Sequence, residues 1–211
     1  MTDFKKRTFK RKGAHRDSSL IVIAAEGAVT EVQYFENFVT KEHFYSSRVR
    51  VEVVKRDDPT HSSPLHVLES LDKIITDFEL NDGDELWLLI DKDRWTPAQF
   101  AEVSTKCNAK NINMSVSNPC FELWLLLHFR EISSQLELFN TSDKITAELK
   151  SILGSYNKTI KFEKFKDYVY SAISNSKIID SNPADRWPQK TGTHVYKLAE
   201  SILKFHSKDN E

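Results

Sequence analysis

The sequence is poor in cysteine and glycine, and it contains no long apolar run. Its two cysteines, Cys107 and Cys120, fit neither a metal-binding motif nor the disulfide framework of a small secreted protein. We expect both thiols to be reduced and buried. No segment approaches the roughly 18 consecutive apolar residues of a membrane span, and residues 1–30 lack the apolar segment of a signal peptide. We therefore expect a cytoplasmic globular protein that makes no contact with membranes.

Positive charge is concentrated at the N-terminus. Residues 1–16 carry seven Lys or Arg and one Asp, so this segment has a net charge of +6 and the remainder of the chain −7. Such an arm, residues 1–17, has too little apolar surface to fold alone. It is either a solvated terminus or a nucleic-acid contact made through residues that include Lys10, Arg11 and Lys12.

The hydrophobic pattern predicts strands that alternate with helices over residues 18–130. Strands are expected at 20–25, 48–54, 85–90 and 112–116, and helices at 29–44, 65–78, 97–108 and 119–129. This alternation is typical of a parallel sheet that is covered by helices on both faces. From residue 131 the pattern predicts only helices, at 144–153, 162–176 and 194–205. We therefore expect an α/β core over 18–130 and a helical appendage over 131–211 that packs on it.

Carboxylates follow two of the predicted strands. Glu26-Gly27 follows the first strand, and Asp91-Lys92-Asp93 follows the third. Functional groups gather at the carboxyl ends of parallel strands, and residues two apart on an extended chain project to the same side. Three close carboxylates would repel one another unless a cation lay between them, and Mg²⁺ prefers such oxygen ligands. The spacing favours a metal site for phosphodiester chemistry, with Glu26 as general base or ligand, although an ordinary turn and a solvated loop also fit it.

The segment "SNPCFELWLLLHF", residues 117–129, places a charge in an apolar helix. Asn118 is expected to cap this helix and Pro119 to occupy its first position. Glu122 then lies in the first turn, where it either interacts with the helix N-terminus or joins the acids at the strand ends. We expect His128 to be a structural residue of the core or its rim.

Cations that could bind phosphate lie beside the acids and late in the chain. Lys92 and Arg94 flank Asp93, while Lys190 and His194 belong to a basic, aromatic-containing region. Each is a candidate nucleic-acid contact, and each also fits a solvated surface charge.

Three segments together resemble a known family. "IVIAAEGAVTEVQYFENF" resembles the E-G-x-x-T-E-x-x-Y-F opening of RloB-like proteins, "LLIDKDRW" resembles their D-x-D-R segment, and "SNPCFELWLLLHF" is very close to their S-N-P-x-F-E-x-W-x-x-x-H-F signature. The similarity spans nearly the whole chain, including the basic arm and "KTGTHVYKLAE". The S-N-P-x-F-E-x-W block is its most specific part.

The resemblance implies a Toprim-like, mostly parallel sheet flanked by helices, as in topoisomerases, bacterial primases and OLD-family nucleases. By motif match, Glu26, Asp91 and Asp93 would be Mg²⁺ or Mn²⁺ ligands and catalytic residues, with Glu122 a supporting acid. Trp95 occupies the third acidic position of longer D-x-D-x-D motifs, which leaves the number of metals open. The chain is too short for the tyrosine domain of a topoisomerase, which favours a nuclease.

The function predicted from the sequence is a metal-dependent nuclease that cleaves RNA, with tRNA a candidate, or DNA. The resemblance implies that it is the effector of a bacterial antiphage system, with an ATPase as candidate partner and a homo-oligomer as candidate assembly. The alternative is a Toprim-like module that binds nucleic acid or regulates an ATPase-containing complex without chemistry. A primase-like nucleotidyl transferase fits less well, because nothing resembles a template-handling domain.

Overall fold

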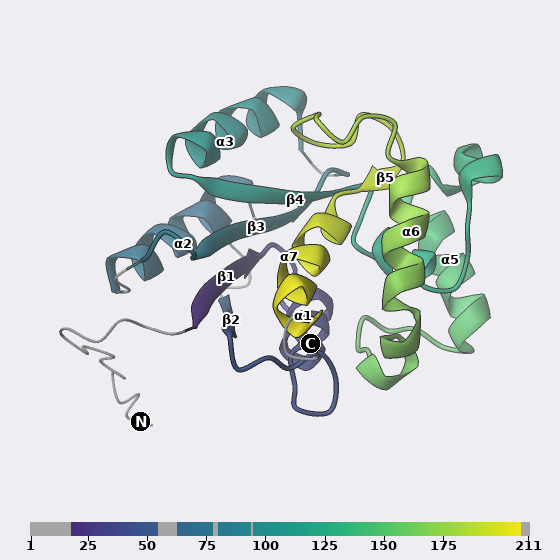
Figure 1. Cartoon of the computed structure of the whole chain (residues 1–211). Coiled ribbons are helices and arrows are strands. Elements are labelled where there is room, and N and C mark those ends of the chain that lie inside the picture. The colour runs from purple at the N-terminus through teal and green to yellow at the C-terminus, as the bar shows by residue number, and fades with distance from the viewer. Residues whose placement is uncertain (1–17, 55–62, 78–79, 94, 208–211) are drawn as a thin grey trace, which may run out of the picture.

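A computed structural model of the chain describes residues 18–54, 63–77, 80–93 and 95–207. Its centre is a five-stranded sheet in the order β2-β1-β3-β4-β5 (Figure 1). The strands β1 (Ser19–Ala25), β2 (Val49–Val54), β3 (Glu85–Asp91) and β4 (Ile112–Asn118) are parallel. The predicted α/β class and the four parallel strands are therefore confirmed.

Helices cover both faces of the sheet. Helices α2 (Pro64–Asp77) and α3 (Pro97–Ala109) pack on one face over an aliphatic cluster, because alternate residues of β1 such as Leu20 and Val22 project there. Helices α1 (Thr30–Phe38) and α7 (Val195–Ser207) pack on the other face, to which Ile21 and Ile23 project. Continuous apolar strands such as β1 are thus buried from both sides, as parallel strands usually are.

The C-terminal region lies beside the α1 face and adds an edge strand to the sheet (Figure 1). It contains α5 (Ser142–Leu153), α6 (Val169–Ile179) and three short 3₁₀ helices at Ser133–Phe139, Phe162–Lys164 and Lys166–Tyr168. Strand β5 (Gly192–Thr193) pairs antiparallel with β4 through Ser117 and Asn118. The prediction of helices alone after residue 131 is wrong at β5, which is too short to give a periodic signal.

The fourth predicted helix begins later than expected. Helix α4 runs over Glu122–Leu127, and Phe121 precedes it without a side-chain cap. The side chain of Asn118 instead donates to the backbone carbonyls of Pro188 and Lys190, at 3.1 and 2.9 Å. The Asn118–Pro119 peptide is cis. Asn118 therefore ties β4 to the 181–192 loop, and the predicted cap at Asn118 with Pro119 in the first turn is wrong.

Four further expectations concern the end of α1, the cysteines, the basic arm and membrane contact. Helix α1 ends at Phe38, several residues before the predicted end, because turns follow it. Both cysteines are free and buried, as predicted. The basic arm with Lys10, Arg11 and Lys12 lies outside the described residues. None of the described helices has the length and apolar character needed to cross a membrane.

Candidate active site

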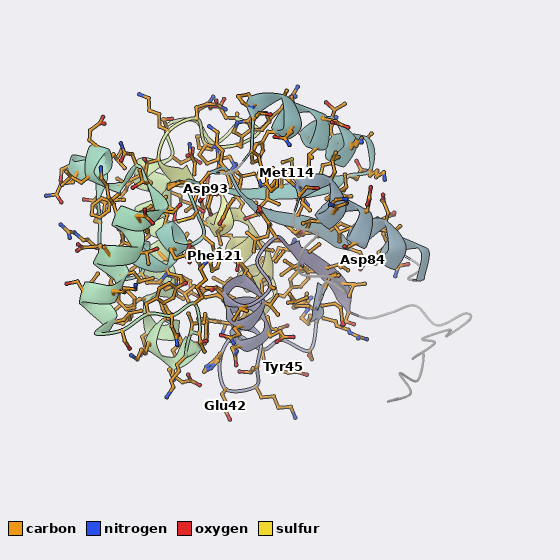
Figure 2. The ribbon with its side chains drawn as sticks, turned by 180° about the vertical axis from the view of Figure 1, so that it is seen from behind. Glu42, Tyr45, Asp84, Asp93, Met114 and Phe121 are labelled. Atoms are coloured by element: carbon orange, nitrogen blue, oxygen red, sulfur yellow. The ribbon has the colours of Figure 1, made fainter. Side chains whose placement is uncertain are left out.

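The acids predicted at the strand ends gather at the carboxyl edge of the parallel sheet. Figure 2 labels Asp93, just beyond β3, and Asp84, just before it, at opposite ends of this strand. Glu26 follows β1, and Glu122 opens α4 on the same edge as Asp93. The charges of Glu26, Glu122 and Asp93 all act on Asp91, so the four predicted acids are neighbours.

Glu26 is fixed by two donors that come from the β3 end. Its Oε2 accepts from the backbone N–H of Asp91 at 3.1 Å, and the indole N–H of Trp95 lies 3.2 and 3.3 Å from its two oxygens. The backbone N–H of Glu26 donates to the Leu89 carbonyl at 2.8 Å, which extends the β1–β3 pairing to this residue. Glu26 therefore points toward Asp91, as the strand-end argument predicts.

Glu31 is a fifth acid of this group, and the sequence reasoning did not assign it. It lies in the first turn of α1 and is 8% exposed. Its carboxylate lies over Gly27, since a Cβ at Gly27 would be 1.8 Å from Glu31 Oε2. The missing side chain of Gly27 leaves the space that the Glu31 carboxylate fills. The sequence feature that could have identified Glu31 is the T-E pair of the opening motif, in which Glu31 lies five residues after Glu26.

Burial and repulsion by neighbouring acids make Glu31 and Asp91 hard to ionise. The pKa of Glu31 is raised to about 7, chiefly by burial and also by the charges of Glu122 and Glu26, while a backbone hydrogen bond and Lys158 act in the opposite direction. Burial also raises the pKa of Asp91 well above its usual range, and the neighbouring acids add to this shift, with Glu31 first among them. A group of acids at this edge therefore costs folding free energy at neutral pH, which indicates a role other than stability.

Asp93 lies at the rim of the group. Strand β3 ends at Asp91, and the chain then bends because the N–H groups of Lys92 and Asp93 both donate to the Pro119 carbonyl at 3.1 Å. The side chain of Asp93 accepts from the Ser142 hydroxyl at 2.7 Å. The premise of an extended chain from Asp91 to Asp93 is therefore wrong: Asp93 is exposed, whereas Asp91 is partly buried and feels the charges of the other acids.

Glu122 is held by the C-terminal region. The hydroxyl of Tyr156 donates to Glu122 Oε1 at 2.9 Å and lies 3.4 Å from the Thr30 hydroxyl. Thr30 is the first residue of α1, so Tyr156 bridges the two helices that carry Glu31 and Glu122. Both placements that the sequence leaves open hold for its position: Glu122 is in the first turn of α4, and its charge acts on Asp91.

The donor set suits a hard divalent cation by its chemistry. Glu26, Glu31, Asp91 and Glu122 offer carboxylate oxygens, which Mg²⁺ and Mn²⁺ prefer, and their mutual repulsion would fall if a cation lay among them. In the part of the chain that the structure describes, no three His, Cys, Asp or Glu side chains are arranged to hold a metal ion together. Joint ligation would therefore require side-chain rotation.

The predicted phosphate-binding cations occupy different environments. The Lys92 ammonium donates to the carbonyls of Pro188 and Gln189 at 3.4 and 3.5 Å, and Lys190 is exposed on the same loop. His194 is 1% exposed, and burial lowers its pKa to about 4 despite Asp180 at 3.4 Å. A neutral, buried imidazole argues against a nucleic-acid contact at His194. Arg94 lies outside the described residues.

His128 and Tyr34 form a buried, hydrogen-bonded polar pair. Burial lowers the pKa of His128 to about 3, so the ring is neutral. Its Nδ1 lies 2.9 Å from the Trp124 carbonyl, which can only accept, so Nδ1 carries the proton and Nε2 accepts from the Tyr34 hydroxyl at 2.9 Å. The expected structural role of His128 agrees with this geometry.

The fold and this edge define the class: an α/β protein with a mostly parallel sheet and a buried acid group at the carboxyl ends of its strands. The sequence model of the RloB-like protein family matches residues 21–202. The chain therefore belongs to the RloB-like protein family, as its motifs predict. Searches of curated proteins and of solved structures returned no match.

Proposed function

We propose that the protein is a Mg²⁺- or Mn²⁺-dependent nuclease that hydrolyses phosphodiester bonds of RNA, with tRNA a candidate, or of DNA. The observation that carries the proposal is the group formed by Glu26, Glu31, Asp91 and Glu122, whose charges oppose one another at the carboxyl edge of the sheet. The pKa values of Glu31 and Asp91 are raised, and catalytic sites commonly contain acids perturbed in this way. The order β2-β1-β3-β4 and the acids after β1 and β3 agree with a Toprim-like arrangement.

The acids have different proposed roles. Glu26 and Asp91 would be the principal metal ligands, with Asp93 at the rim and Glu122 in support. A bound divalent cation would supply an activated water and neutralise charge on the phosphate. Glu31 suits proton transfer, because a carboxyl with a pKa near 7 exchanges its proton readily at neutral pH.

The test is cleavage of tRNA, single-stranded RNA and plasmid DNA with Mg²⁺, Mn²⁺ or EDTA. Asp91→Asn should lower the rate by about 100-fold or more, equivalent to about 2.7 kcal/mol or more of transition-state stabilisation. Asp82→Asn is the matched control, since Asp82 is exposed in the turn before β3, at the opposite edge of the sheet. Equal cleavage by wild type and Asp91→Asn, or cleavage that persists in EDTA, contradicts the proposal.

A second candidate is a module that binds nucleic acid or regulates an ATPase partner without chemistry. It is favoured by the absence, among the described residues, of three side chains set to ligate a metal. In that case Asp91→Asn leaves binding unchanged, whereas removal of residues 1–17 weakens binding and flattens its salt dependence. The resemblance to antiphage effectors supports a defence role for either candidate, and an ATPase pull-down from the native host tests the partner.

A further inference from the structure

The loop over residues 154–160 joins the C-terminal region to the acid group. It follows α5 and is fixed to α1 by two hydrogen bonds: the Thr30 hydroxyl donates to the Lys158 carbonyl at 2.7 Å, and the Ile160 N–H donates to Gln33 Oε1 at 3.0 Å. Tyr156 is buried and donates to Glu122. The loop is therefore held at both helices that carry the buried glutamates.

Lys158 is presented outward by this anchoring. Its backbone has φ 69°, a left-handed conformation that is uncommon for lysine, and its side chain is exposed. The hydrogen bond from the Thr30 hydroxyl to the Lys158 carbonyl fixes that conformation. Thr30 directly precedes Glu31 in the chain, so the bond holds Lys158 close to this acid. The ammonium is close enough to Glu31 to oppose the rise in its pKa. An exposed cation thus lies beside the acids.

A nucleic-acid substrate needs such a cation. The acids repel a phosphodiester, and a lysine at their rim offsets this repulsion and donates up to three hydrogen bonds to phosphate oxygens. Lys92, which the sequence placed beside the acids, directs its ammonium to the Pro188 and Gln189 carbonyls. The tertiary structure therefore offers Lys158, from the C-terminal region, for the role that the sequence assigned to Lys92.

We propose that Lys158 contacts a backbone phosphate of the nucleic-acid substrate at the acid group, with Thr30 and Tyr156 as positioning residues. The inference rests on the proposed function for its substrate class. It makes the active site composite, since the α/β core supplies the acids and the C-terminal region supplies the cation.

The test measures binding rather than turnover. Fluorescence anisotropy of labelled single-stranded RNA and DNA oligonucleotides is followed over a salt series, with Ca²⁺ in place of Mg²⁺. Lys158→Ala should weaken binding about fivefold to tenfold and lower the salt slope by about 0.7, the loss of one phosphate contact to a single strand. Lys158→Arg should retain binding within about twofold, since it keeps the charge.

Two further variants keep the result interpretable. Lys158→Gly removes the cation but suits the left-handed backbone, so it should fold and bind as weakly as Lys158→Ala. Lys106→Ala, on the exposed surface of α3, should bind like wild type. Unchanged affinity and slope in Lys158→Ala and Lys158→Gly overturn the proposal, as does a wild type that binds neither oligonucleotide.

The outcomes separate this inference from the nuclease proposal. Weakened binding in the Lys158 variants supports the phosphate contact even if wild type cleaves nothing. Cleavage by wild type with unchanged binding and cleavage in the variants supports the nuclease and rejects Lys158.

Discussion

Helices α1 and α4 carry two buried polar groups that differ in their energetics. Tyr34 and His128 form a neutral pair in which each polar atom has a partner, surrounded by rings such as Trp124 and Phe165 at 5.0 and 5.3 Å from the imidazole. Glu31, one turn before Tyr34, and Glu122 lie instead among other acids. The first group stabilises the fold, and the second opposes it.

Hydrogen bonds between α1 and α4 counteract the charge repulsion among the acids that these helices carry. The Tyr34–His128 hydrogen bond joins the two helices directly, and the Tyr156 hydroxyl donates to Glu122 on one of them and lies 3.4 Å from the Thr30 hydroxyl on the other. Buried polar bonds with satisfied partners therefore fix the spacing of helices that would otherwise separate to relieve charge repulsion. The hydrogen-bonded Tyr34–His128 pair therefore holds α1 and α4 in the positions that keep the acids together.

The largest expected effect comes from breaking the satisfied pair. His128→Ala removes a fully enclosed ring and leaves the Tyr34 hydroxyl without its acceptor, so the free energy of unfolding should fall by about 3 kcal/mol. Urea denaturation at pH 7 measures it. His66→Ala, an exposed histidine of α2, is the control and should change stability by no more than about 0.5 kcal/mol. A loss as small as that of His66→Ala would show that the pair does not support the helices.

Removing the charge of Glu31 should raise the free energy of unfolding, the opposite of the effect of His128→Ala. The unfolded Glu31 loses its proton near pH 4.5 and the folded one near 7, so its ionisation destabilises the fold as pH rises through this window. Glu31→Gln should therefore raise the free energy of unfolding by about 1–3 kcal/mol at pH 8 in EDTA, with no gain below about pH 4.5.

Thermal unfolding at the two pH values checks this result. Glu36→Gln, on the exposed side of the same helix, serves as control and should change stability little at either pH. A Glu31→Gln variant that is no more stable than wild type at pH 8 would remove the basis for a repulsive acid group.

The smallest effect on stability is expected from moving Glu31 without changing its charge. Gly27→Ala places a Cβ where the Glu31 carboxylate lies, and the flexible side chain must move away, so stability should change by about 1 kcal/mol or less. Cleavage should fall about tenfold, and the double variant with Glu31→Gln should lose less than the two separate losses combined. Gly83→Ala, at the opposite edge of the sheet, is the control. Full additivity in this cycle would show that Gly27 does not act through Glu31.

Much of the fold follows from local pattern. The continuous apolar runs of β1 and β3 and the alternation with helices predict the parallel sheet, since such strands need cover on both faces. The positions of Glu26 and Asp91 follow from the same pattern, because strand ends are readable from the sequence. The bend after Asp91 cannot be read from the sequence, because it depends on hydrogen bonds to the Pro119 carbonyl. Pro119 follows the end of β4, a different strand.

The candidate site was predicted only in part for a related reason. Glu31 and Lys158 join it through contacts that have no local signal: a carboxylate lying over Gly27, and a loop carbonyl bound by Thr30 across 128 residues. The sequence groups His194 with Lys190 in a basic, aromatic-containing surface region, whereas the pairing of β5 with β4 places it inside.

The sequence by itself determined the α/β class, the family, and which acids follow strands β1 and β3, because periodicity and motifs are local properties of the chain. Only the tertiary structure decided which charges share one buried volume. Burial and electrostatic repulsion depend on distance through space, and segments far apart in the chain set that distance by packing against α1 and α4.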